Sequence, residues 1–138
     1  IYEMIIMFSK EQLQGILLTI PKPEVHISKD NRLTTGYKVR LRLNIRANED
    51  FLKALQRTLS QYHVASRYKD IEHKSRPLPI LRISGIDNLL EILKLIPDEL
   101  PDAKGHYESF TKIVALVSEG AHLTQEGLDD ILMLKGCI

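Results

Sequence analysis

A run of ten residues at positions 37–46, YKVRLRLNIR, alternates strictly between apolar and polar side chains. Because successive side chains of a β-strand point to opposite faces, this pattern predicts a strand with one face in the core and the other in solvent. The polar face carries Lys38, Arg40, Arg42, Asn44 and Arg46, which is four cations and no acid. Such a face suits an anionic partner, since rows of Arg and Asn match phosphates and base edges. The simpler alternative is an ordinary exposed face that happens to be rich in arginine.

Composition limits where such a partner could bind. The chain has 138 residues and a formal net charge of +1, so a nucleic-acid footprint requires segregation of charge on one surface. Its length predicts a single domain, residues 1–138. Cys137 is alone, which excludes an intramolecular disulfide and a cysteine metal cluster. Apolar runs stay below the roughly 18 residues of a membrane span, so we expect no membrane partner.

Helix and strand signals alternate along the rest of the chain. Ser9 and Gln12 have the spacing of a capping box, which predicts a first helix that ends before Pro21. Strands are predicted at residues 24–28, 37–46, 63–69 and 79–84. Asn48 is expected to cap a second helix, and apolar spacing predicts helices from Ile86, from Tyr107 and after Thr124.

The order of these elements predicts an α+β fold. Its αββαββα core is expected to form a four-stranded, mostly antiparallel sheet with helices on one face, followed by C-terminal helices. The other face of the sheet is then bare, and it carries the arginines.

This order, with a bare basic sheet, resembles the single-motif LAGLIDADG homing endonucleases and the intron maturases derived from them. The most specific match is the segment from Phe110 to Val114 followed by residues 122–128, HLTQEGL, which is similar to the family's "HLTxEGL" ending. The resemblance covers residues 9–135, and it implies a homing-endonuclease-like domain that binds nucleic acid.

The family's name motif falls on the first helix, where residues 13–21 read LQGILLTIP. By resemblance, the acid that binds the divalent metal corresponds to Ile20, and the glycine after it corresponds to Pro21. Metal-assisted phosphodiester hydrolysis needs a carboxylate there, which isoleucine cannot supply. The resemblance therefore implies a degenerate member without nuclease activity and without a cofactor. An active endonuclease that uses Mg²⁺, through Glu24, Asp30 or a partner's acid, is the alternative.

The resemblance also assigns binding residues. Base edges would be read by Arg40, Arg42, Asn44 and Arg82, and phosphates would be contacted by Lys38, Arg46, Arg67 and Lys69. Lys104 lies where the family often places a basic residue near the cleaved phosphate, although a lone loop lysine is more often simply solvated. The histidines lack metal-ligand spacing.

Partners follow from the same resemblance. Duplex DNA is the first expectation and RNA the second, the latter as a maturase-like or ribonucleoprotein structural component. In single-motif members the first helix pairs with its twin, so Leu13, Gly15, Ile16 and Leu18 are candidates for contact with a homodimer or hetero-partner. A monomer is the equal alternative. An intron-encoded, mitochondrial or other organellar setting is suggested by family association alone.

Overall fold

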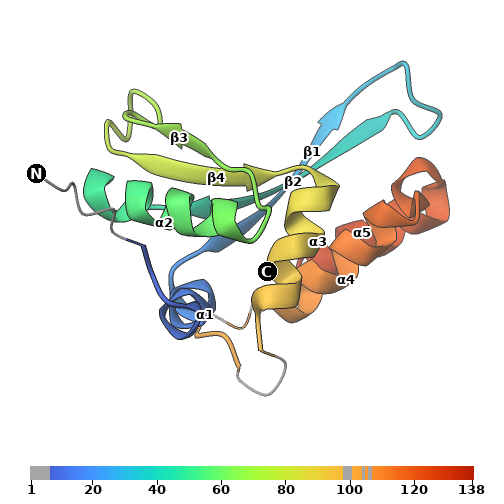
Figure 1. The fold of residues 1–138 in the computed structure, drawn as a ribbon. Helices are drawn as coiled ribbons and strands as arrows, with labels where there is room; N and C mark the ends of the chain where they lie inside the picture. Colours follow the sequence, from blue (N-terminus) through green and yellow to red (C-terminus); the bar gives the residue numbers. More distant parts are fainter. Residues whose placement is uncertain (1–6, 98–100, 104, 106) are drawn as a thin grey trace, which may run out of the picture.

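A computed structural model describes residues 7–97, 101–103, 105 and 107–138. Figure 1 shows a sheet with its helices gathered beneath it. The elements, in chain order, are α1 (Lys10–Thr19), β1 (Lys22–Lys29), β2 (Tyr37–Ile45), α2 (Glu49–Gln61), β3 (Arg67–Lys69), β4 (Ile80–Ser84), α3 (Ile86–Leu95), α4 (Tyr107–Ser118), the 3₁₀ turn η1 (Ala121–Leu123) and α5 (Gln125–Lys135). In the described part of the chain, each helix is too short or too polar to cross a membrane.

The sheet has the strand order β1-β2-β4-β3, and every neighbouring pair is antiparallel. This confirms the predicted α+β class, with its four-stranded sheet and helices on one face (Figure 1). The alternating strand occupies the second position in the sheet and pairs with β1 on one side and β4 on the other.

The core lies between the sheet and the helices. Leu41, Leu43 and Ile45 of β2 are buried there, as the alternation predicts, and they belong to one apolar cluster with Leu55 of α2 and Phe110 of α4. At about 25 cal/mol per Å² of buried apolar surface, such a cluster is the main stabilising contribution to the fold.

The third strand is shorter than predicted, because it spans Arg67–Lys69 and not residues 63–69. His63 has a positive φ of 61°, and the N–H of Val64 donates to the carbonyl of Leu59 at the end of α2. The N–H of Ala65 donates to Asn88 of α3. These residues are therefore bonded to helices, and the sheet ladder begins only after them.

Helix starts agree with their capping signals. Ser9 Oγ accepts from the N–H of Gln12, whose side chain accepts from the N–H of Ser9, so the capping box before α1 is confirmed. Thr124 accepts from the N–H of Gly127 at the start of α5. A Cβ on Gly127 would lie far inside van der Waals distance of the Ala121 carbonyl oxygen. The turn η1 and helix α5 therefore meet backbone against backbone.

Candidate nucleic-acid interface

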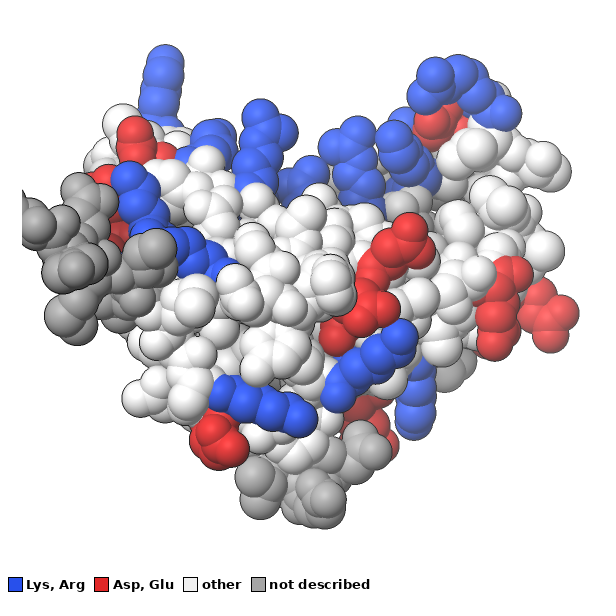
Figure 2. Space-filling model, in the orientation of Figure 1, with Lys and Arg blue, Asp and Glu red and all other residues white. Residues whose placement is uncertain are grey.

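The strand register aligns polar side chains in rows across the face of the sheet opposite the helices, which we call the outer face. One row contains Lys22, Asn44, Arg82 and Arg67, and the next contains Glu24, Arg42 and Ser84. His26 pairs with Arg40, and Ser28 pairs with Lys38. In Figure 2, Lys and Arg side chains crowd the upper edge of the molecule, over this face, and the edge is hollowed between two raised ends.

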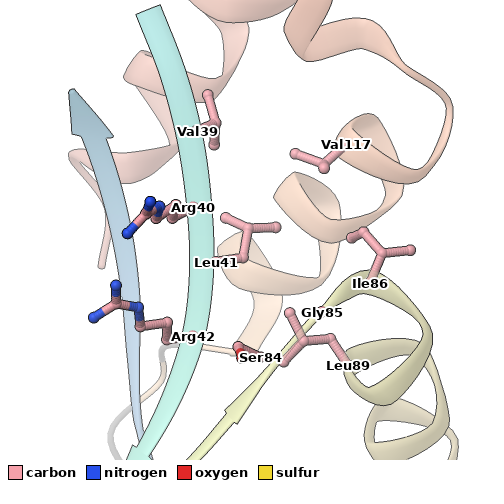
Figure 3. A pocket seen from close by; sticks show the side chains of 9 residues that line it. All are labelled: Val39, Arg40, Leu41, Arg42, Ser84, Gly85, Ile86, Leu89 and Val117. Carbon is pink, nitrogen blue, oxygen red and sulfur yellow. The ribbon is translucent and has the colours of Figure 1, made fainter. Parts of the chain in front are cut away.

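Arg40 and Arg42 point away from the core. In Figure 3 their side chains leave β2 on one side, while Val39 and Leu41 face Val117 across a cavity of about 370 Å³. Arg40 is exposed and has no ion-pair partner among the described residues. Arg42 lies 3.7 Å from Glu24, which is too long for a strong hydrogen bond. Both guanidinium groups can therefore reach a ligand.

Asn44 lies deeper, with only 2% of its surface exposed. Its Nδ2 donates to Glu24 over 2.7 Å, and its Oδ1 accepts from Arg82 Nε over 3.1 Å. Each end of the amide therefore has a protein partner. Asn44 holds Glu24 and Arg82 in place and presents little of its own surface to a ligand.

Glu72 is the centre of a second group, on the side of the sheet where β4 and β3 lie. Its side chain is 4% exposed and accepts two hydrogen bonds of 2.8 Å from Arg46. Arg76 donates to it over 3.0 Å, and Arg82 lies 3.8 Å away. The hydrogen bonds from Arg46 lower the pKa of Glu72 to about 2, against the opposing effect of burial.

A further cation joins this group, because Lys69 Nζ donates to the backbone carbonyl of Glu72 over 3.2 Å. The hollow beside this group, of about 280 Å³, is lined by Arg42, Arg67, Lys69, Ile80, Arg82 and Ser84. The outer face therefore has an open half around Arg40 and a half whose cations are partly neutralised from within.

Sequence reasoning placed the eight predicted binding residues on one face. The strand register puts seven of them on the outer face, and Arg46 follows directly after the end of β2. Their contact with a nucleic acid stays a prediction. Sequence reasoning missed the two carboxylates, Glu24 and Glu72, that organise these residues. Glu72 stands in a charged loop, and its closest partner Arg46 is 26 residues away in sequence, so local pattern carries no signal for the pair.

A third pocket, of about 360 Å³, lies where α1 ends at the outer face. It is lined by Thr19, Ile20, Lys22, Asn44 and Arg46. Ile20 is half-buried there, and none of the lining residues is a carboxylate. Within the described ranges, no cluster of three or more His, Cys, Asp or Glu could hold a metal ion. Lys104 lies outside the described residues.

Divalent cations such as Mg²⁺ take oxygen ligands, chiefly carboxylates, and the residues at the end of α1 do not fit that requirement. Glu24 is already bonded to Asn44, and Asp30 forms a 2.9 Å ion pair with Arg32 in the β1–β2 hairpin. That contact, mainly the hydrogen bond from Arg32, lowers the pKa of Asp30 to about 2.

The residues proposed for contact along α1 divide into two sets. Leu13 is fully buried in the core, so its side chain does not reach the outer surface of the helix. Gly15 is exposed and has open space above it, while Ile16 and Leu18 are half-buried. Contact of this strip with a second chain stays a prediction.

Comparison with known proteins gives one consistent result. No protein-family model and no curated protein matches the sequence. Among solved structures, the homing endonuclease I-TnaI superposes with a TM-score of 0.80 at 21% identity, over 94% of this chain and 87% of that one. The LAGLIDADG homing endonuclease I-LtrWI bound to target DNA gives 0.81 at 20% identity, over 95% of this chain and 44% of that one. I-SmaMI bound to cleaved DNA gives 0.79 at 20% identity, over 96% and 44%. The chain therefore spans less than half the length of these last two proteins.

Proposed function

We propose that this chain, which has the fold of the LAGLIDADG homing endonucleases, binds duplex DNA through its outer face and does not cut it. One observation carries the proposal: the outer face presents cations from all four strands, with Arg40 exposed and Arg42 within reach of a ligand. The similar proteins I-LtrWI and I-SmaMI are described as bound to DNA, which supports the choice of partner.

The contacts within the face suggest different roles for its residues. Arg40 and Arg42 are the groups we assign to base edges, because they project from β2 and are only loosely held. Lys38, Arg67 and Lys69 lie nearer the ends of the strands and are assigned to phosphates. Asn44 and Arg82 act as a bonded unit, in which Arg82 makes the contact and Asn44 fixes its orientation. Arg46 is held by Glu72 and offers its remaining nitrogen.

The one sheet and its continuous apolar cluster support treating the chain as one domain. The alternative function, DNA cleavage, is supported by the similar proteins, which are homing endonucleases. The composition of the pocket at the end of α1 opposes it, because Ile20 stands where a carboxylate would be required. Binding without cleavage is the function that agrees with both observations.

The test compares two double variants in binding to random-sequence duplex DNA. Arg40→Ala/Arg42→Ala should weaken binding by about tenfold or more, since each lost arginine contact with the bases contributes about 1–3 kcal/mol. The control, Lys94→Ala/Lys112→Ala, removes two cations from α3 and α4 beneath the sheet and should leave affinity nearly unchanged.

Thermal melting accompanies each measurement. If the arginine variant binds normally but melts much earlier, these arginines are structural and the proposal fails. A parallel series with duplex RNA of the same sequence decides the partner, because tighter binding to RNA would replace DNA in the proposal.

A further inference from the structure

The pocket at the end of α1 is lined by cations, although the end of a helix carries the negative end of its dipole. Lys22 begins β1 and pairs with Asn44, so its side chain lies on the outer face, where it is exposed. Arg46 lines the same pocket from β2's end. Two cations and no carboxylate therefore line a space of about 360 Å³. Behind this lining, Glu24 bonds to Asn44 and Glu72 bonds to Arg46.

Both cations have donors available. In the described part of the chain Lys22 has no ion-pair partner, and its ammonium group carries three N–H donors. Glu72 engages Nε and Nη2 of Arg46, which fixes the guanidinium, and these two bonds do not use Nη1. The carbonyl of Leu18 accepts from the N–H of Ala103 over 2.6 Å, which offsets part of the negative end of the α1 dipole.

We propose that this pocket binds a backbone phosphate of the nucleic acid directly, with Lys22 supplying the positive charge and Arg46, already paired with Glu72, supplying a further N–H donor. The inference rests on the proposed function, since it concerns the same outer face. A phosphate is the ligand that fits, because it is anionic and its oxygens accept from ammonium and guanidinium donors. Binding in this pocket is then independent of metal ions.

The test uses Lys22→Met, which keeps an unbranched chain of similar length and removes the charge, and Lys22→Arg, which restores it. Affinity for random-sequence duplex DNA is measured over a series of salt concentrations, in EDTA and in Mg²⁺ at matched ionic strength. Lys22→Met should bind several-fold more weakly, and its slope of log K against log salt should be shallower by about 0.9, the value for one phosphate contact. Lys22→Arg should retain both values. Lys135→Met, on α5 beneath the sheet, is the matched control and should change neither.

Comparing affinity in EDTA with affinity in Mg²⁺ tests separately whether binding needs a metal ion. We expect wild-type affinity in EDTA to be at least as high as in Mg²⁺, because no metal is needed. Tighter binding in Mg²⁺ that is lost in Glu24→Gln would show a metal site and overturn the inference.

Failure of the inference is distinguishable from failure of the proposed function. If Lys22→Met leaves affinity and slope unchanged while Arg40→Ala/Arg42→Ala weakens binding, the pocket does not hold a phosphate and the outer face still binds. If neither variant weakens binding, the proposed function itself falls. Lys22→Gln serves in place of Lys22→Met should the latter melt early, and the same slopes decide the result.

Discussion

Gly127 allows α5 to pack closely against η1, because it has a hydrogen atom where other residues have a Cβ. It is buried at the start of α5, and an added Cβ would collide with the backbone carbonyl of Ala121. Backbone cannot yield as a flexible side chain can. We predict that Gly127→Ala lowers the free energy of unfolding by about 1–3 kcal/mol, the usual cost of overpacking, as measured by urea denaturation.

Gly15 provides the matched control for this prediction. It lies in the interior of α1, it is exposed, and an added Cβ would meet nothing within 4 Å. Gly15→Ala should therefore stabilise the monomer by up to about 1 kcal/mol, because alanine favours the helix. Equal effects at the two positions would show that helix propensity, and not the contact with Ala121, governs Gly127.

Some residue roles were predictable and others were not. Three helix starts could be predicted from their capping residues, Ser9, Asn48 and Thr124. A capping side chain bonds to a backbone N–H only three residues away, so its signal is local. The need for glycine at 127 was visible only as part of a family resemblance. Its physical reason requires knowing that Ala121 returns against α5, which local sequence does not encode.

Glu72 connects the β3–β4 loop to the end of β2 through Arg46 and to β4 through Arg82, and it also pairs with Arg76 within the loop. Glu72→Gln would leave three guanidinium groups without their counter-ion. We predict a loss of about 1–3 kcal/mol of stability together with tighter binding to random-sequence DNA and a steeper salt dependence. A purely structural role would lower stability without changing the salt slope, so unchanged slopes would contradict the prediction.

The pH dependence of the same variant separates the ion pairs from packing. The pKa of Glu72 is lowered from 4.5 to about 2, so its stabilising contribution is complete above pH 4.5 and is lost as the pH falls towards 2. The stability difference between wild type and Glu72→Gln should therefore be constant above about pH 5 and shrink below it. Asp30, whose pKa is also about 2, titrates in both proteins and cancels. A difference that stays constant down to pH 2 would contradict this account.

Strands differ in how much their own sequence reveals. Tyr37–Ile45 forms β2 almost as predicted, because Leu41, Leu43 and Ile45 meet the core while Arg40 and Arg42 meet solvent. The alternation is weaker at the ends, where Tyr37 is exposed and Asn44 is buried. The β3 segment was overestimated, since residues before Arg67 also alternate but bond to α2 and α3. Periodicity describes which side chains can share a face. It does not say which backbone groups will find a strand partner.

For the molecule as a whole, we predict that the isolated protein makes no metal-dependent cuts in DNA. The pocket at the end of α1 is lined by Ile20 and two cations and by no carboxylate that could bind a metal ion. The loss of a metal ligand typically costs several kcal/mol of transition-state stabilisation. The assay incubates the protein with a DNA library in Mg²⁺ or Mn²⁺ and sequences the ends. Reproducible double-strand cuts that disappear in Glu24→Gln or Asp30→Asn would establish the endonuclease alternative.

The whole-molecule arrangement was predictable in class but not in detail. Two αββ units and a bare basic face followed from the order of elements and from Arg40 and Arg42. The strand order β1-β2-β4-β3 depends on which strands pair at long range, and nothing in β3 or β4 alone specifies it. The split of the outer face into an open half and a neutralised half depends on Glu24 and Glu72, whose contacts exist only after the sheet has formed.

The strict alternation of β2 has a consequence for how this protein can change over time. Leu41, Leu43 and Ile45 build the core, while Arg40 and Arg42 lie on the outer face. Inserting or deleting one residue within the strand would exchange the two sets. Arginines would enter the core while leucines faced solvent, so folding and the proposed binding would fail together. Point substitutions at even positions carry no such penalty where the side chain is exposed, as at Arg40. If the outer face binds as proposed, its preference for a ligand can therefore change through substitutions, whereas a change in the length of β2 would destroy the fold.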